Sequence, residues 1–381
     1  MGKKSIKKIN KAIGWCYDNL LSLKYDYQYH NLWRRQSNPS PISKSDLKQY
    51  KRKWGRLGVR VNPVYLKLFS QYCGVNLNII PEDISHNVIE NILCPPIYRA
   101  YFEDKNMFDR ILGQHRMPQT YLRCIDGRYY DASYTFVDQN AYINLYEVLK
   151  PYGEFVIKPT RNTKSGNGVT LYTINPDAKY PIIPESISFR GLRETHGDNF
   201  IVQQRLEQSE FMSQFSNTSI NTLRLLVYKS VVDDRCHLIN GCIRIGQAGS
   251  FLDNAHQGGK IVGLDIHTGE LGDYLINQYG DRFTEHNGID FSKKHFVLTD
   301  INAIRKFSED LCSDIPYHRC FNLDVMIDKT GNPKLIEFNI SAMGIWAYQF
   351  LGNSCFGEYT DEIIDYCRDN LCRKQSQYLF I

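Results

Sequence analysis

The sequence lacks long hydrophobic runs, paired cysteine motifs and a P-loop, and each absence excludes a class of protein. No apolar run approaches the roughly 20 residues that a membrane-spanning helix needs. We expect no signal peptide, because five lysines between positions 3 and 11 interrupt the first apolar residues. The eleven cysteines show no Cys-x-x-Cys pair and no Cys/His zinc spacing. We therefore expect reduced thiols in a cytoplasmic protein, without a zinc site.

The 381 residues are 42% hydrophobic and 23% charged, which is typical of a globular protein with two or three domains. The net charge of +5 is uneven: residues 1–60 hold fifteen Lys and Arg against three Asp, or +12, which leaves −7 for the rest. In this basic region Ile6, Ile9, Ile13 and Leu20 recur at helical spacing. Such a helix can lie on an anionic membrane surface, here the inner membrane face, or pack on the protein's own core, which we favour. No nucleic-acid-binding module is recognised, so we expect no nucleic acid partner.

The order of predicted elements divides the chain into four regions. Residues 1–98 are basic and mainly helical, 99–150 form a linker subdomain, 151–207 a small strand-rich subdomain, and 208–381 a larger one. Strands and helices that mix without regular β-α-β repetition predict an α+β fold. Helices are expected at Lys105–Leu112, Gln139–Leu149, Thr299–Ser313 and Tyr359–Cys372, and strands at Glu154–Lys158, Val169–Thr173, Phe200–Gln204, Thr222–Lys229, Cys236–Ile245 and Lys260–Asp265.

Two runs of alternating apolar residues, 322–328 and 333–339, flank a Gly-Asn turn and predict an antiparallel hairpin. With a loop of residues 329–332, Asp324 lies opposite Glu337, and Asn339 shares the face of Glu337. Opposed carboxylates repel each other, and a cation would remove that cost. Two carboxylates and an amide oxygen suit Mg²⁺, which usually binds together with phosphates. The alternative is a solvent-facing acidic hairpin.

A predicted strand ends at Lys158 and runs into a loop with two glycines and basic residues. Glycines let backbone N–H groups approach phosphate oxygens, and Lys158 would add a fixed positive charge. The loop matches neither the P-loop pattern nor a dinucleotide fingerprint, since a strand follows its glycines. The alternative is an ordinary hairpin turn. The candidate phosphate-binding residues are Lys158, Thr160, Lys164, Ser165, Gly166 and Gly168.

The next segment is an apolar strand that gives way to polar residues at Gln203 and Arg205, followed by Leu206. Its backbone could form a hinge that binds an adenine edge, and Glu210 shortly after could bind ribose hydroxyls. An edge strand with its turn is an equally good interpretation of this segment.

Arg224 and Arg244 lie within otherwise apolar strands. A buried arginine needs an anionic partner, such as a transferring phosphoryl group or a substrate carboxylate. The alternative is a structural ion pair, with Asp265 or Glu337 as the partner.

A polar loop with two glycines separates these strands from the hairpin. Such a loop could close over a substrate, with Asp253, Asn254, Gly258 and Gly259 as its candidate residues. We assign no catalytic role to His256.

The order of these segments resembles the ATP-grasp superfamily, and more narrowly its sugar-transfer-associated branch, linked to bacterial surface polysaccharide synthesis. Asp104-Lys105, Ile157-Lys158-Pro159, Asn221-Thr-Leu-Arg224 and Glu337-Phe-Asn339 carry the resemblance, which runs from about residue 45 to about 360. It implies two α+β subdomains that grip ATP, preceded by the mainly helical N-terminal region. Gln203 stands where the family often has Glu, and the phosphate loop is poorer in glycine than usual.

Carried over by position, the resemblance implies a role for each candidate residue. Lys105 and Lys158 would contact ATP phosphates, and the backbone around Gln203–Leu206 would hold adenine. Arg224 and Arg244 would steady the γ-phosphate or an acyl-phosphate. Asp324, Glu337 and Asn339 would hold Mg²⁺.

The implied activity is an ATP- and Mg²⁺-dependent carboxylate–amine ligase that works through an acyl-phosphate. Its substrates would be an amine or amino acid and an acidic sugar of a capsule or O-antigen. Phosphoryl transfer needs positioned positive charge rather than a protein nucleophile, which fits these residues. The alternatives are an ATP-grasp-type kinase for a sugar or small molecule, and a non-catalytic glycan- or membrane-binding scaffold.

Overall fold

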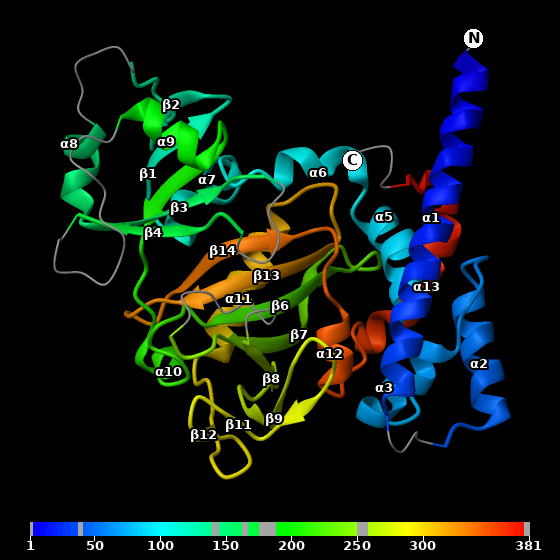
Figure 1. Cartoon of the computed structure of the whole chain (residues 1–381). Helices are drawn as coiled ribbons and strands as arrows, with labels where there is room; N and C mark the ends of the chain where they lie inside the picture. The colour runs from blue at the N-terminus through cyan, green and yellow to red at the C-terminus, as the bar shows by residue number, and fades with distance from the viewer. Residues whose placement is uncertain are drawn as a thin grey trace.

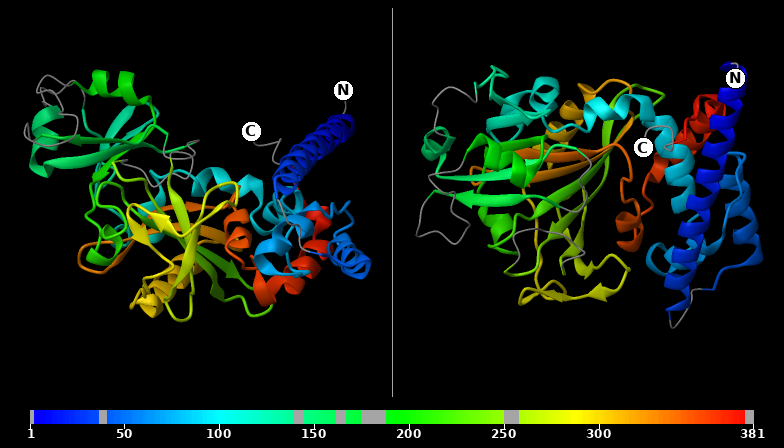
Figure 2. Two further views of the ribbon diagram at one scale, coloured as in Figure 1. Left: turned by 60° about the horizontal axis from the view of Figure 1, so that its bottom comes forward. Right: turned by 45° about the horizontal axis from the view of Figure 1, so that its top comes forward.

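The computed structural model describes residues 3–36, 41–138, 145–161, 167–174, 188–249 and 258–376, with side chains from residue 8 onward. A small sheet, a large sheet and a group of helices follow one another across the molecule (Figure 1). Two further views show the same order, with the N-terminal helix at the margin opposite the small sheet (Figure 2). The α+β architecture with a helical N-terminal region is as predicted.

The helices of the described chain lie mainly before residue 120 and after residue 300. The α-helices are α1 (Lys3–Arg34), α2 (Lys44–Gly55), α3 (Val64–Cys73), α4 (Glu82–Ile84), α5 (Glu90–Leu93), α6 (Pro96–Phe102), α7 (Phe108–Leu112), α8 (Leu145–Leu149), α9 (Phe189–His196), α10 (Glu210–Ser213), α11 (Ile301–Ser313), α12 (Trp346–Phe350) and α13 (Thr360–Asp369). A π-helical turn, η1 (Ser85–Ile89), joins α4 to α5. Short 3₁₀ turns are η2 (Gln114–Arg116), η3 (Lys150–Tyr152), η5 (Gly357–Tyr359) and η6 (Leu371–Arg373).

The strands of the described chain are β1 (Thr120–Ile125), β2 (Arg128–Asp131), β3 (Glu154–Pro159), β4 (Thr170–Thr173), β5 (Phe200–Gln204), β6 (Thr222–Lys229), β7 (Cys236–Ile245), β8 (Lys260–Leu264), β9 (Leu271–Ile276), β10 (Arg282–Phe283), β11 (Glu285–His286), β12 (Ile289–Asp290), β13 (Cys320–Ile327) and β14 (Pro333–Asn339). Those predicted at Phe200–Gln204, Thr222–Lys229 and Cys236–Ile245 are confirmed at both ends.

The large sheet is antiparallel, in the order β10-β9-β8-β7-β6-β13-β14. All eight residues of β13 are buried, which explains why its sequence is almost continuously apolar. The apolar side chains of this sheet share one hydrophobic core with the N-terminal helices. For example, the rings of Phe69 in α3 and Phe350 in α12 lie 4.8 Å apart. The helical region is therefore packed onto the sheet that carries the acidic hairpin.

The small sheet has the order β2-β1-β5-β3-β4 and its own hydrophobic core. β1 pairs with β5, so the sheet crosses the boundary that we placed near residue 150. The chain enters this unit before β1 and leaves it after β5. The two passages meet, because Gln204 donates its backbone N–H to the Gln119 carbonyl at 2.8 Å.

The described starts of two predicted helices differ from the expected ones. The helix predicted from Lys105 begins at Phe108, because the Asp104 side chain accepts the Asn106 N–H and holds residues 104–107 in a turn. The helix predicted from Gln139 is described only from Leu145, and residues 139–144 lie outside the described chain.

The apolar stripe of the N-terminal helix is not buried, contrary to the packing that we favoured. Ile9, Ile13 and Leu20 are 45%, 38% and 66% exposed, because the described part of the molecule packs against the opposite face of α1. None of the described helices is both long and apolar enough to cross a membrane.

Candidate active site

The hairpin of β13 and β14 places Asp324 directly opposite Glu337, as predicted. The register that we predicted near the turn is wrong by one residue, since Ile327 rather than Asp328 faces Pro333. Asp328 instead closes the turn, where its side chain accepts the N–H groups of Thr330 and Asn332. A bulge after Asp324 restores the predicted pairing at the acidic residues.

Asp324 is held by two arginines from neighbouring strands. Arg224 on β6 is its direct cross-strand partner and donates Nε and Nη2 to its two oxygens, both at 2.9 Å. Arg244 on β7 adds Nη1 at 3.1 Å. Burial raises the pKa of Asp324, but the charges of Arg224 and Arg244 outweigh it and keep that pKa below its usual value. The expected ion pair exists, but its acid is Asp324 rather than Asp265 or Glu337.

Two lysines reach β14 from the side of the small sheet. Lys105, in the turn before α7, donates Nζ to Glu337 Oε1 at 2.7 Å. Lys158, at the end of β3, has its Nζ 3.5 Å from the carbonyl of Ile336, which the bulge leaves outside the strand pairing. Burial and the charge of Lys105 lower the pKa of Lys158 to about 8, although Glu337 opposes them. Both lysines therefore stand at the acidic hairpin with their amines close to its edge.

Asn339 lies on the same face of β14 as Glu337, as predicted. Its amide nitrogen donates to the Asn322 carbonyl at 3.3 Å, so its Oδ1 is the atom left for a ligand. Asn322 is fixed in turn by Tyr348, whose hydroxyl donates to Asn322 Oδ1 at 2.9 Å.

The acidic hairpin suits Mg²⁺ that is bound jointly by protein and phosphate better than a metal ion held by protein ligands alone. No group of three or more His, Cys, Asp or Glu in the described part of the chain could hold a metal ion. Mg²⁺ needs less, since it is commonly bound by one or two carboxylates with phosphates and water. Asp324 and Glu337 supply the carboxylates and Asn339 an amide oxygen. Lys105 now neutralises Glu337, and a bound cation would take over that role.

The phosphate-loop residues are only partly described. Thr160 is fully buried; its carbonyl accepts the Lys105 N–H at 3.1 Å, while its Oγ1 has no hydrogen-bond partner. Arg161 pairs with Asp104 at 2.6 Å, so the turn that carries Lys105 is tied to the start of the loop. Gly168 ends the loop at φ +78°, beside Pro159. Lys164, Ser165 and Gly166 lie outside the described residues.

The predicted hinge connects the two sheets. Gln203 is buried in β5, where its amide nitrogen donates to Thr120 Oγ1 at 3.3 Å and its Oε1 lacks a partner. Arg205 forms an ion pair with Glu154, Leu206 is half-buried, and Glu210 is exposed at the start of α10. The adenine and ribose roles of these residues stay predictions.

The structure describes only one end of the predicted substrate loop. Gly258 is exposed at φ +92° beside Gln247, and Gly259 is buried just before β8. Asp253, Asn254 and His256 lie outside the described residues.

Sequence reasoning missed a buried charge cluster behind the site. His86 lies between Glu82 and Glu90, with ring nitrogens 3.1 and 3.0 Å from their carboxylates. Burial lowers the pKa of His86, but the charge of Glu90 and the hydrogen bonds that the ring donates to both acids raise it to about 10. A usable signal was present, since acid, histidine and acid recur every four residues in an apolar helix.

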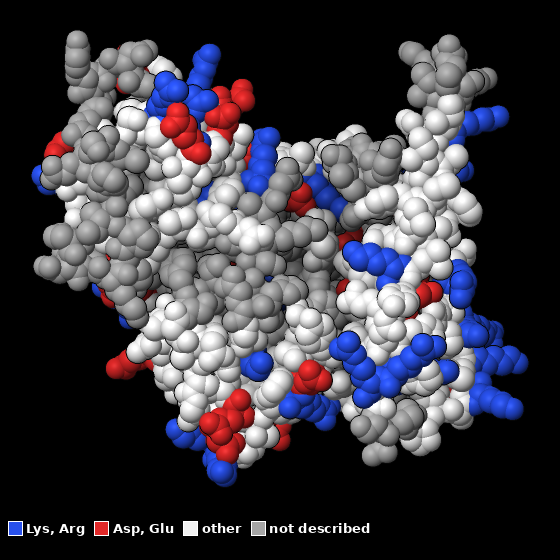
Figure 3. Space-filling view, viewed as in Figure 1, with Lys and Arg blue, Asp and Glu red and all other residues white. Residues whose placement is uncertain are grey.

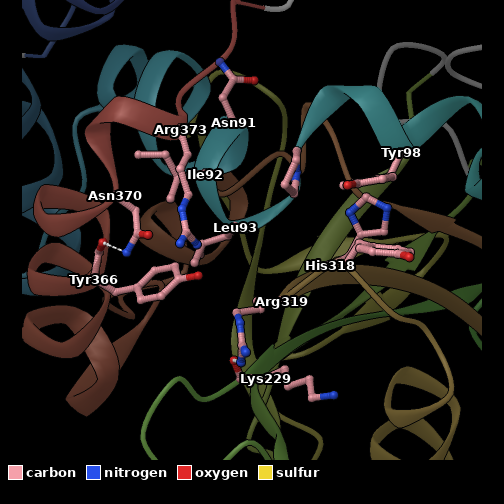
Figure 4. Close-up of a pocket in the computed structure, with 12 residues that line it drawn as sticks. Asn91, Ile92, Leu93, Tyr98, Lys229, His318, Arg319, Tyr366, Asn370 and Arg373 are labelled. Atoms are coloured by element: carbon pink, nitrogen blue, oxygen red, sulfur yellow. Dashed lines mark hydrogen bonds between the residues drawn. The ribbon is translucent and has the colours of Figure 1, made fainter.

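A separate hollow opens just before β13, and none of the candidate site residues lines it (Figure 4). Its volume is about 250 Å³, and Lys229, Arg319 and Arg373 line it together with the stacked rings of Tyr98 and Tyr317. Arg319 is used structurally, because it donates to the Ser230 carbonyl and to Asp234, both at 3.0 Å.

A family model described as "Sugar-transfer associated ATP-grasp" matches residues 93–362. No curated protein matches the chain. Similar solved structures include the D-cycloserine synthetase DcsG, at 14% identity and a TM-score of 0.39, over 74% of this chain and 73% of that one. The D-alanine-D-alanine ligase from Coxiella burnetii is similar at 12% identity and a TM-score of 0.40, over 74% of this chain and 60% of that one.

A third similar structure is the biotin carboxylase domain of the 2-oxoglutarate carboxylase from Hydrogenobacter thermophilus, in complex with MgADP, ADP and bicarbonate. The identity is 10% and the TM-score 0.40, over 70% of this chain and 46% of that one.

Proposed function

Since the chain belongs to the sugar-transfer-associated ATP-grasp family, we propose that it is an ATP- and Mg²⁺-dependent carboxylate–amine ligase. One observation carries the proposal: the acidic hairpin and the two lysines meet at one edge of the large sheet. Acidic oxygen ligands and fixed positive charges side by side are what a metal-bound triphosphate requires. The proposed substrates are an acidic sugar of a bacterial surface polysaccharide and an amine or amino acid.

Each residue of the site has a role in the proposed reaction. Mg²⁺, when bound by Asp324, Glu337 and Asn339, would neutralise phosphate charge. Lys158 and Lys105 would hold the phosphate oxygens by charge. Arg224 and Arg244, both of which bond Asp324, would fix that ligand and add positive charge beside the reacting phosphoryl group.

The chemistry balances in two steps. A carboxylate oxygen of the sugar attacks the γ-phosphorus, and the bond to the bridging oxygen of ADP breaks, which gives an acyl-phosphate and ADP. The amine nitrogen then attacks the acyl carbon, phosphate leaves with the C–O electron pair, and the nitrogen loses a proton to solvent. The protein contributes position and charge rather than a nucleophile.

The test follows ADP and free phosphate together, with purified protein, Mg²⁺, pooled uronic acids and pooled amino acids. We expect equal amounts of both products, dependent on both substrate pools, and loss of turnover in Glu337→Gln. Glu194→Gln is the control, because this exposed acid pairs only with Arg190 along its own helix among the described contacts.

The product pattern separates the alternatives. ADP without free phosphate would assign a kinase, and absence of Mg-ATP binding would favour a scaffold. Full turnover in Glu337→Gln would contradict the assignment of the acidic hairpin.

A further inference from the structure

One face of α1 carries uncovered apolar side chains at alternating spacings of four and three residues. At 100° per residue these positions fall within about 80° of the helix circumference. Their exposure is high: Leu20, Leu23 and Tyr27 are 66%, 58% and 71% exposed. We call this face the α1 seam, formed by Ile9, Ile13, Cys16, Leu20, Leu23 and Tyr27.

The opposite face of α1 is the one that the protein uses for packing. Tyr29 and Leu32 are buried in the core. Further along, Asp18 bonds Ser376 at 2.9 Å and Lys374 at 2.8 Å, so the C-terminal segment also lies on this side. The orientation of the helix is therefore fixed by other contacts, and the seam is held outward. Figure 3 shows the upper part of this helix as a largely uncharged column with basic side chains at its margin.

The spacing of the seam is typical of a helix that pairs with another helix. Apolar residues at steps of four and three are the a and d positions of a heptad, which supercoiling keeps facing a second helix. A stripe of about 80° is narrower than the broad apolar face of a helix that lies in a lipid surface or on a core. Trp15, which is 67% exposed, lies outside this stripe.

We propose that two copies of this chain pair antiparallel through the α1 seam. A two-fold axis near residue 18 matches large side chains with smaller ones, which puts Ile9 against Tyr27 and Cys16 against Leu20. The remaining layer is Ile13 against Leu23. This pairing also separates the lysine-rich ends of the two helices, whereas a parallel pair would bring those like charges together.

The seam is short, so the pairing is reversible rather than permanent. Its first and last residues are 18 positions apart, which corresponds to about 27 Å of helix at 1.5 Å per residue. That length holds between two and three heptads. The inference does not depend on the proposed enzyme activity, because the seam residues are remote in sequence from every candidate site residue.

The test is sedimentation velocity of the full-length chain over a range of micromolar concentrations. We expect a monomer–dimer equilibrium in the wild type. Leu20→Lys should weaken it by roughly a hundredfold or more, since each dimer loses two buried leucines. Trp15→Lys is the matched control: it removes an equally exposed apolar residue from the same helix and should leave the equilibrium unchanged. Circular dichroism checks that both variants are folded.

Crosslinking tests the orientation in a Cys372→Ser background, which removes the other exposed cysteine of the described chain. Leu20→Cys should form disulfide-linked dimers with Cys16 of the second copy, whereas the background alone should not. Dimers linked in the background alone would show a parallel pair and overturn the antiparallel arrangement.

Three results would overturn the pairing itself. The first is a monomeric wild type across the concentration range. The second is a monomer that sediments with phosphatidylserine vesicles and loses this binding in Leu20→Lys, which would assign the seam to lipid. The third is a monomer that dimerises only after deletion of residues 377–381, which would mean that the apolar C-terminal residues cover the seam within one chain.

Discussion

Glu90 accepts the backbone N–H of Ala342 at 2.8 Å, which links the helical region to the loop after the acidic hairpin. Ala342 has φ +47°, a conformation that a non-glycine residue keeps only when its surroundings enforce it. The loop directly follows β14, which carries Glu337 and Asn339. The N-terminal helices therefore hold the strand of the proposed metal site in place.

His86→Gln should destabilise the protein by about 3–5 kcal/mol, because Glu82 and Glu90 would remain buried without their cation. Urea denaturation measures the change. His237→Gln is the matched control, since His237 also pairs with an acid at 3.1 Å, four residues away, but in a partly exposed position. An exposed pair of this kind contributes at most about 1 kcal/mol. Equal losses in the two variants would contradict a special role for the buried cluster.

The stabilisation from the His86–Glu90 pair should depend on pH in a defined direction. The pKa of His86 is raised to about 10, so its contribution is complete below about pH 6.5 and is lost as the pH rises towards 10. Burial raises the pKa of Glu90, but the charge of His86 outweighs it and lowers that pKa to about 2. Its contribution is complete above about pH 4.5 and is lost below that pH.

The difference in unfolding free energy between wild type and His86→Gln should therefore be largest between about pH 4.5 and 6.5. Urea titrations at one-unit pH intervals measure it. A difference that stays constant up to pH 10 would show that the histidine is not charged in the folded protein.

Nucleotide affinity should fall as the pH rises through about 8, because Lys158 then loses the charge that would hold phosphate. The fall should approach tenfold per pH unit above that pKa. Isothermal titration with Mg-ATP between pH 7 and 9.5 measures it. In Lys158→Arg the guanidinium stays charged, so the profile should be flat. Lys306→Arg, at an exposed position of α11, should keep the slope of the wild type.

Gly168→Ala should weaken ATP binding and destabilise the β3–β4 hairpin. A Cβ there would lie 2.7 Å from Pro159 Cγ, and φ is +78°. Gly288→Ala isolates the conformational cost, since its φ is +77° but no atom lies within 4 Å of the added Cβ. That cost is about 1 kcal/mol. Thermal unfolding and ATP titration of both variants separate the clash from the strain. Equal effects on ATP binding would show that the clash has no part in it.

The sequence predicted best what depends on neighbouring residues along one strand or across one turn. The alternation of apolar residues and the length of each apolar run were enough to predict β6 and β7. They also allowed the hairpin to be paired correctly at Asp324 and Glu337. The bulge at Ile336 could not be predicted, because it follows from how Asp328 closes the turn. The correct acidic pair thus emerged although the turn register was shifted by one residue.

Contacts between segments that are distant along the chain could not be predicted from the sequence. Asp324 lies 100 residues from Arg224, and Glu337 lies 232 residues from Lys105, so charge complementarity alone left several pairings open. The prediction that the apolar stripe of α1 packs on the protein's own core was wrong for another reason. Helical spacing shows that a face is apolar, but it does not show whether the protein's own core or another molecule covers it.

The hydrogen bond between Gln119 and Gln204 has a consequence for how this molecule could change in evolution. The unit between them has its own core, and its entry and exit lie side by side. A segment with adjoining ends can be exchanged as a cassette without disturbing its host. The β1–β5 unit could therefore be swapped between relatives, which would bring a new phosphate loop to an unchanged acidic hairpin.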